Sequence, residues 1–191
     1  MKLTLFLVAL FSFPVLLFAQ TTPLQDLINK KMKYDSLRNA YQLKIMVLVK
    51  MERDTIYYVI NDAEFPDSGI NTTINILRDK SGKILILSIY PYSESGDWFV
   101  GFTHYFDENG NTFAFERLTS FYNSGCTDKM ATEKIDKFYS SDFNETGNTY
   151  SLTGPNDKPL KKSKCDLLYQ FDYSVYKNIN EVLRQNHIPQ L

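Results

Sequence analysis

Residues 70–90, INTTINILRDKSGKILILSIY, decide the fold of this chain. Apolar and polar side chains alternate from Ile70 to Ile76, which is the period of a half-buried β-strand. A second apolar run follows at 83–90. The segment between them, residues 79–82, begins with Asp and ends with Gly82, and glycine adopts a positive φ without steric cost. We therefore predict a β-hairpin here.

The same hairpin design occurs again further along the chain. Asp107-Glu108-Asn109-Gly110 separates the strand-like segments 98–106 and 111–122. Residues 91–96 are rich in Pro, Ser and Gly, which continue a central strand poorly, so they are predicted to form the loop between the two hairpins. Consecutive hairpins of one design predict an antiparallel β-meander.

Further strands are predicted on both sides of this centre. Residues 41–51 alternate with period two, 52–54 indicate a turn, and 55–61 are rich in β-branched and aromatic residues, so a hairpin is expected there. Residues 132–139 fit either a strand or a helical turn. We favour a strand, with 147–153 as its partner, because a meander is already under way.

The two ends of the chain carry helical signals. Thr22 is a capping residue, Pro23 suits the first helical position and Gln25 follows three residues after the cap, which predicts a helix at 23–37. Its polar residues, Lys31 among them, are assigned to the outer side. A second helix is predicted at 174–185 with Ser174 as its cap, because four apolar residues fall on one helical face.

These elements predict an α+β fold that consists mainly of an antiparallel β-meander. Residues 84–89 are apolar on both sides of their strand, so both faces of the sheet must be covered there. The terminal helices can cover one face. The other can be shielded if the sheet closes partly into a barrel, and the sequence is compatible with both architectures.

Length and charge limit the classes of protein that are possible. The chain has 191 residues, with 21 Lys and Arg against 22 Asp and Glu, a net charge of −1. A single domain is expected at this length. Nucleic acid is not expected as a partner, because its recognition needs a strongly basic surface.

Residues 1–19 are predicted to be a cleaved signal peptide. Lys2 precedes an apolar run from Leu3 to Phe18, and Ala19 offers a small residue at the cleavage point. The run is shorter than a membrane span and contains Pro14. Residues 20–191 are therefore expected to form one soluble exported domain, periplasmic or secreted. It has no cysteine at the junction for a lipid anchor and no later membrane span.

Cys126 and Cys165 are predicted to form a disulfide, because an even pair of cysteines in an exported chain is usually bridged. The alternatives are a nucleophilic cysteine with His104 or His187 as its base, and a zinc site. The cysteines and histidines lack the short paired spacings of zinc sites. We expect no metal and no cofactor.

One cluster could carry acid–base chemistry. His104 lies on a predicted strand, and the carboxylates of Asp107 and Glu108 follow directly after it. The simpler interpretation is that the two acids solvate a hairpin turn. No nucleophile elbow, phosphate loop or paired-histidine motif occurs in the sequence, so no catalytic residue is assigned.

Trp98, the only tryptophan, is the candidate ligand-binding residue. It follows the polar segment Ser93-Glu94-Ser95-Gly96-Asp97, so it lies at the edge of a predicted loop. An aromatic face in that position can stack on a sugar or a peptide. The alternative is that Trp98 seals the core.

The sequence resembles small exported β-rich proteins of unknown function typical of Bacteroidota in two features. One is the leader, which ends in Ala-Gln, and the other is the hairpin segment Tyr105-Phe106-Asp107-Glu108-Asn109-Gly110-Asn111-Thr112-Phe113. The resemblance covers the leader and residues 70–122. It implies a periplasmic or surface-directed β-meander protein without an assigned activity.

The expected function is that of a non-enzymatic binding module of the cell envelope, with a protein, a peptide or a glycan as its partner. One alternative is an envelope hydrolase or isomerase that uses His104 with Asp107 or Glu108. A second alternative is a purely structural or inhibitory domain.

Overall fold

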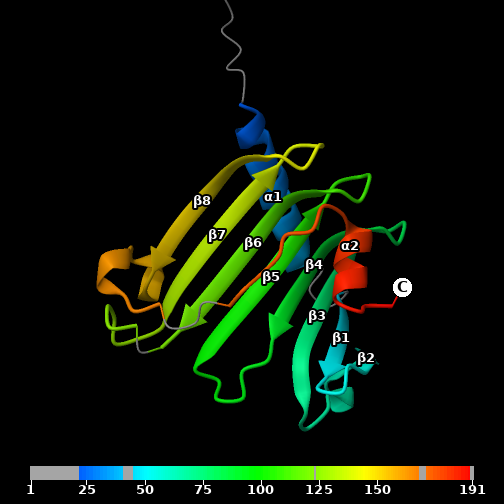
Figure 1. Ribbon diagram of the computed structural model, residues 1–191, viewed down its shortest axis with the longest axis horizontal. Coiled ribbons are helices and arrows are strands. Elements are labelled where there is room, and N and C mark those ends of the chain that lie inside the picture. Colours follow the sequence, from blue (N-terminus) through cyan, green and yellow to red (C-terminus); the bar gives the residue numbers. More distant parts are fainter. Residues whose placement is uncertain (1–21, 41–44, 123, 168–170, 190–191) are drawn as a thin grey trace, which may run out of the picture.

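The computed structural model describes residues 22–40, 45–122, 124–167 and 171–189. One antiparallel sheet of eight strands forms the centre, in the spatial order β2-β1-β3-β4-β5-β6-β7-β8 (Figure 1). The strands are β1 (Met46–Met51), β2 (Ile56–Val59), β3 (Ile70–Arg78), β4 (Ile84–Pro91), β5 (Trp98–Phe106), β6 (Thr112–Phe121), β7 (Ala131–Tyr139) and β8 (Glu145–Thr153). The α-helices are α1 (Pro23–Ala40) and α2 (Ile179–Gln185), and short 3-10 turns are η2 (Asp62–Glu64), η3 (Pro155–Asp157) and η4 (Lys162–Lys164).

The predicted α+β class is confirmed, but the sheet is not closed into a barrel. Strands β2 and β8 are its two edges. Closure is not needed to shield the second face, because α1 packs on one face while α2 and the chain before it lie on the other (Figure 1).

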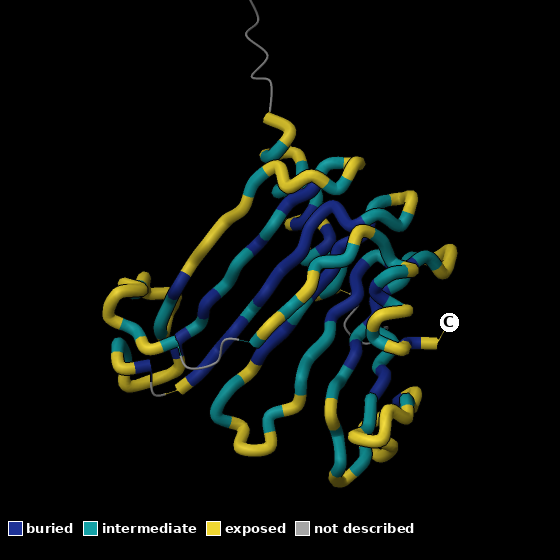
Figure 2. Tube along the Cα trace, viewed as in Figure 1, coloured by how far each residue is buried: buried dark blue, intermediate teal, exposed yellow. Residues whose placement is uncertain are grey.

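The sheet carries a core on each face, which explains why 84–89 is apolar on both sides. Ile86 packs with Tyr34 of α1 on one face, and Leu87 packs with Val182 of α2 on the other. Burial is concentrated in the central strands, while the loops and the outer strands are exposed (Figure 2).

The hairpin prediction is confirmed in detail. In the loop after β3, Asp79 N–H donates to Lys83 O and Gly82 N–H donates to Asp79 O. The loop after β5 repeats this pattern with Gly110, and both glycines have positive φ, 88° and 77°. The strand at 132–139 and its partner are also confirmed, as β7 and β8.

The strand order departs from a simple meander at one end. β1 pairs with β2 on one side and with β3 on the other, so β2 lies outside β1. β1 places Leu48 and Val49 in buried positions on opposite faces, whereas β2 has four residues and exposes two tyrosines. The better-buried strand therefore takes the interior position. Residues 41–44, predicted as the start of β1, lie outside the described residues.

The predicted C-terminal helix begins later than expected. α2 starts at Ile179 with Asn178 as its cap, whose side chain accepts the N–H of Glu181, so the prediction of Ser174 as the cap is wrong. Residues 171–178, which we call the strap, are extended instead and cross the sheet in front of the central strands (Figure 1). The end of the strap is held against the loop after β5 and the start of β6: Asn178 bridges to Asn111, and Thr112 N–H donates to Lys177 O.

The N-terminal helix is confirmed, with one correction. Gln25 N–H donates to the Thr22 hydroxyl at 3.3 Å, as a capping residue requires. Lys31, however, does not face outward: it is only 3% exposed and points at the sheet. The carboxylates of Glu116 on β6 and Asp136 on β7 make that burial possible, because they neutralise the ammonium charge.

Candidate functional site

Trp98 lines a cleft at the end of the sheet where β1, β3 and β5 meet the loop after β4. The cleft has a volume of about 660 Å³. Its lining combines two aromatic rings, two carboxylates, an amide, a hydroxyl and one aliphatic side chain, contributed by Trp98, Tyr92, Glu52, Glu94, Asn71, Ser95 and Ile70.

Backbone hydrogen bonds fix the segments that carry these side chains. Glu52 N–H donates to Gly69 O at 3.0 Å, which holds the turn after β1 against the start of β3. Tyr92 N–H donates to Asn71 O at 2.9 Å, which holds the end of β4 against β3. The cleft residues from three segments are therefore positioned before any ligand arrives, and this lowers the entropy that binding costs.

The loop that carries Glu94 and Ser95 is braced by its own side chains. Gly96 N–H donates to the Ser93 hydroxyl at 3.1 Å, and the Ser95 hydroxyl donates to the Asp97 carboxylate. At the other end of this loop, Tyr122 N–H donates to Asp97 O. Short polar side chains that bond to nearby backbone are the usual way to rigidify a loop.

Trp98 is partly core and partly cleft. Its ring lies 4.7 Å from the ring of Phe171 at the start of the strap, and the residue is half-buried. The two interpretations of Trp98 are thus combined in one side chain: it packs against the strap and it lines the cleft. By contrast, Tyr92 is 49% exposed.

The chemistry of the cleft suits a ligand rich in hydroxyl groups. Carboxylates accept hydrogen bonds, and an amide both donates and accepts them, so Glu52, Glu94 and Asn71 can pair with hydroxyls of either orientation. The apolar C–H faces of a sugar ring can pack on an aromatic ring such as that of Tyr92.

His104 lies elsewhere, beneath the strap. It is 1% exposed and stacks with Tyr176 of the strap at 5.8 Å and with Phe106 at 6.2 Å. Its Nε2 accepts the backbone N–H of Tyr176 at 3.3 Å. Burial lowers the pKa of His104 from 6.5 to about 3, so the ring is neutral at physiological pH.

The structure does not bring His104 together with the two acids that follow it in sequence. Asp107 Oδ1 accepts the N–H groups of Asn109 and Asn111, so its carboxylate braces the hairpin turn. None of the hydrogen bonds or ion pairs of the described residues joins His104 to Asp107 or Glu108. His104 does line a second cleft, of about 370 Å³, between the strap and the ends of β3 and β4.

Aromatic stacking holds the strap over the sheet. Tyr173 stacks on Phe115 at 5.3 Å and on Phe102 at 5.9 Å. The guanidinium of Arg117 lies 5.5 Å from the centre of the Tyr173 ring and is itself paired with Glu133. Together with the Trp98–Phe171 and His104–Tyr176 contacts, these contacts cover one face of β5 and β6.

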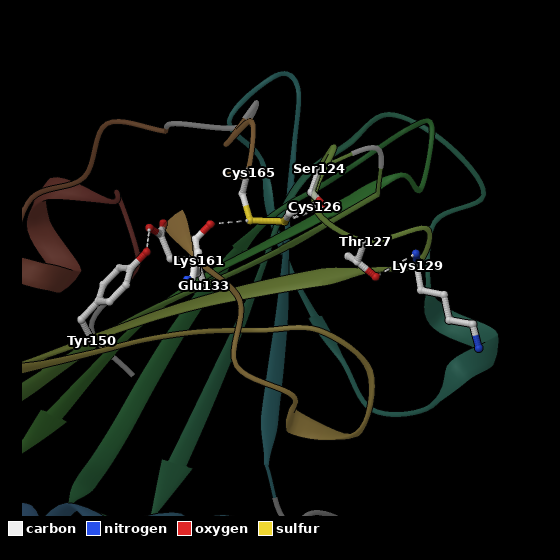
Figure 3. Close-up of a disulfide and its surroundings, with 8 residues drawn as sticks. All are labelled: Ser124, Cys126, Thr127, Lys129, Glu133, Tyr150, Lys161 and Cys165. Carbon is white, nitrogen blue, oxygen red and sulfur yellow. Dashed lines mark hydrogen bonds between the residues drawn. A yellow bond between two sulfur atoms is a disulfide. The ribbon is translucent and has the colours of Figure 1, made fainter. Parts of the chain in front are cut away.

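The predicted disulfide is present (Figure 3). The Sγ atoms of Cys126 and Cys165 are 2.03 Å apart, and the bridge joins the connection between β6 and β7 to the segment before the strap. Beside it, Asp166 N–H donates to Ser124 O at 2.8 Å. The bridge therefore fixes the chain shortly before the strap.

The charged cluster around Lys31 was not foreseen from the sequence. Its Nζ lies 2.7 Å from Glu116, 3.0 Å from Asp35 and 3.3 Å from Asp136. Burial alone would lower the pKa of Lys31, but the nearby carboxylates outweigh it and raise the pKa above its usual value. Only a long-range signal could have revealed this cluster, because Glu116 lies 85 residues along the chain.

Of the two described α-helices, neither combines the length and the apolar character that crossing a membrane requires. Comparisons with protein-family models, with curated proteins and with solved structures found no match for this chain.

Proposed function

We propose that this chain is an exported, non-enzymatic binding protein of the cell envelope and that the Trp98 cleft takes a glycan. The observation that carries the proposal is the composition of that cleft. Two aromatic rings lie beside two carboxylates and an amide, on segments that backbone hydrogen bonds already hold in place.

Export is part of the proposal. The basic and apolar segment at 1–19 has the pattern of a signal peptide. The Cys126–Cys165 bridge supports an oxidising compartment, since disulfides persist there and are rare in the cytosol. The resemblance of the Asp-x-x-Gly hairpins to small exported proteins of Bacteroidota agrees with this destination.

A glycan is favoured over a basic peptide because the cleft offers both donors and acceptors. The Asn71 amide can donate hydrogen bonds as well as accept them, and the Ser95 hydroxyl, whose proton goes to Asp97, still accepts them. A hydroxyl-rich ligand uses donors as well as acceptors, and a cationic side chain uses acceptors alone. Catalysis by His104 receives no support from the geometry. Its Nε2 already accepts a backbone N–H, and Asp107 braces its own turn.

The test is affinity electrophoresis of the oxidised protein in native gels that contain soluble β-glucan, mannan, xylan or dextran. We expect retardation by at least one polysaccharide and a loss of about tenfold or more in affinity for Tyr92→Ala, the scale of one aromatic contact. Tyr58→Ala is the matched control, because Tyr58 is equally exposed (52% against 49%) and lies on β2.

Two results would contradict the proposal. One is that Tyr92→Ala and Glu94→Gln both bind the retarding polysaccharide as the unmodified protein does. The other is that no polysaccharide retards the protein while a lysine-rich peptide binds in a manner that depends on Glu52 and Glu94, which would make the cleft a peptide site.

A further inference from the structure

Strand β2, at one edge of the sheet, exposes apolar side chains on both of its faces. Tyr57 is 50% exposed and Tyr58 is 52% exposed, and Ile60, just after the strand, is 72% exposed. The strand contains no charged residue and no proline. Charges and prolines are devices with which natural proteins prevent an edge strand from pairing with another chain.

The opposite edge, β8, is polar and is covered at its end. Its residues are mostly polar and exposed, and Glu145 begins the strand. The following chain also returns along it: Thr153 bridges to Pro159, and Leu160 N–H donates to Leu152 O at 2.9 Å. The two edges of the sheet thus differ: β8 is mostly polar and its end pairs with the returning chain, whereas β2 is apolar and its outer side has no pairing segment among the described residues.

Hydrogen bonds at the turn show which backbone groups of β2 face outward. Met51 N–H donates to Thr55 O at 2.9 Å, so Thr55 faces β1. Along an antiparallel strand, the backbone N–H and C=O groups of successive residues point alternately toward and away from the neighbouring strand. Those of Tyr57 and Val59 therefore also point toward β1, while those of Ile56, Tyr58 and Ile60 point away from it.

Ile60 is the last of the residues whose backbone groups point away from β1. Its N–H already donates to the Glu64 carboxylate at 2.6 Å. The N–H and C=O groups of two residues, Ile56 and Tyr58, are therefore available at this edge, since β1 is the only described strand that pairs with β2.

We propose that β2 pairs with β2 of a second copy of this chain, antiparallel about a two-fold axis at Tyr57. In that register Ile56 of one copy exchanges two backbone hydrogen bonds with Tyr58 of the second copy, and the symmetric pair does the same. The two Tyr57 rings lie directly opposite each other, where aromatic cross-strand pairs are favourable.

A second copy fits this edge better than a strand of another protein. The available stretch is two residues long, because the turn at Asp54 limits it on one side and the Glu64 carboxylate on the other. A longer foreign strand could pair only two of its residues here and would gain no further backbone hydrogen bonds from its length, whereas a second β2 has the same two residues to offer. Its neutral side chains also place no like charges opposite each other.

The first test is sedimentation velocity of the oxidised protein from about 10 µM to 1 mM, the range in which so short an interface should associate. We expect a monomer–dimer equilibrium. Tyr58→Pro removes an outward N–H but no bond to β1, and it should abolish the dimer. Tyr58→Thr loses the same ring but keeps the N–H, and it should still dimerise. A monomer at all concentrations, or dimerisation of Tyr58→Pro as in the unmodified protein, overturns the proposal.

A second variant keeps the test decisive if Tyr58→Pro fails to fold. Tyr57→Cys places two thiols opposite each other across the axis, at a non-hydrogen-bonded position where Cα atoms lie about 4.5 Å apart. It should form a covalent dimer under mild oxidation. Tyr92→Cys, with similar exposure, should stay monomeric. Equal cross-linking of the two variants would contradict the proposed register.

Discussion

The ammonium group of Lys31 on α1 lies 2.7 Å from the carboxylate of Glu116 on β6, and both side chains are almost fully buried. Asp35 and Asp136 complete the surroundings of the ammonium at 3.0 and 3.3 Å. Burial alone would raise the pKa of Glu116, but Lys31 and Lys134 outweigh it and lower the pKa below its usual value. The helix is thus joined to the sheet by ions as well as by apolar packing.

Lys31→Met should lower the free energy of unfolding by about 3 kcal/mol, because it removes the buried counter-charge of Glu116 and Asp136 and leaves them only the more exposed ammonium of Lys134. Chemical denaturation at neutral pH measures this. Lys33→Met is the control on the exposed side of the same helix and should change stability by less than about 0.5 kcal/mol. Equal effects of the two substitutions would show that the Lys31 cluster contributes little.

Acid should destabilise the protein through His104. The pKa of His104 is about 3 in the folded state and near 6.5 in the unfolded state. As the pH falls, His104 is therefore protonated in the unfolded chain before it is protonated in the folded one. The stability that neutral His104 contributes above pH 6.5 is lost as the pH falls toward 3. At pH 5 the loss from this residue should be about 2 kcal/mol.

The contribution of His104 is isolated by measuring the unfolding of the unmodified protein and of His104→Phe at pH 7 and at pH 5. Carboxylates such as Glu116 titrate in both proteins, so their effect is the same in each. The variant loses the acceptor for Tyr176 N–H and should be less stable at pH 7. It should also lose less stability between the two pH values. Identical pH dependence in both proteins would mean that His104 is not buried in its neutral form.

The two hairpin glycines should differ in their response to alanine. Gly82 has φ 88° with open space around the position of a Cβ, so Gly82→Ala should cost about 1 kcal/mol from backbone strain alone. At Gly110 a Cβ would also come within 3.3 Å of Ile179 Cγ2 at the start of α2. Thermal unfolding should therefore show a larger loss for Gly110→Ala, and a reversed order would contradict the described contact between this hairpin and α2.

Reduction of the disulfide should lower stability by about 4 kcal/mol, the chain-entropy estimate for two cysteines 39 residues apart. Denaturation of Cys126→Ser/Cys165→Ser against the oxidised protein measures the loss. Because the bridge precedes the strap, the same variant should exchange the backbone amide of Tyr176 faster. Unchanged stability would show that the bridge constrains neither the unfolded chain nor the strap.

The sequence alone predicts the sheet well because hairpins are local. The alternation at Ile70–Arg78 and the glycines at 82 and 110 act over a few residues, so period and turn chemistry suffice to find them. The N-terminal cap at Thr22 is local in the same sense.

The remaining features depend on residues far apart in the sequence. Lys31 resembles any surface lysine of a helix until Glu116 is brought beside it by the fold. Residues 174–178 have an apolar pattern that suits a helix. An extended strap is favoured instead, because it lets Tyr176 stack on His104 and lets the Lys177 carbonyl accept the Thr112 N–H. Trp98 was identified as a site candidate, whereas Tyr92, Glu52 and Asn71 join it only in three dimensions.

Fluorescence offers the most direct measurement of the central claim, because Trp98 is the only tryptophan in the chain. The polysaccharide that retards the protein in the gel should change the Trp98 emission in a saturable titration, and Tyr92→Ala should shift that titration to about tenfold higher concentration or beyond. A polysaccharide that binds by calorimetry while the Trp98 emission stays unchanged would place the binding site elsewhere and contradict the account.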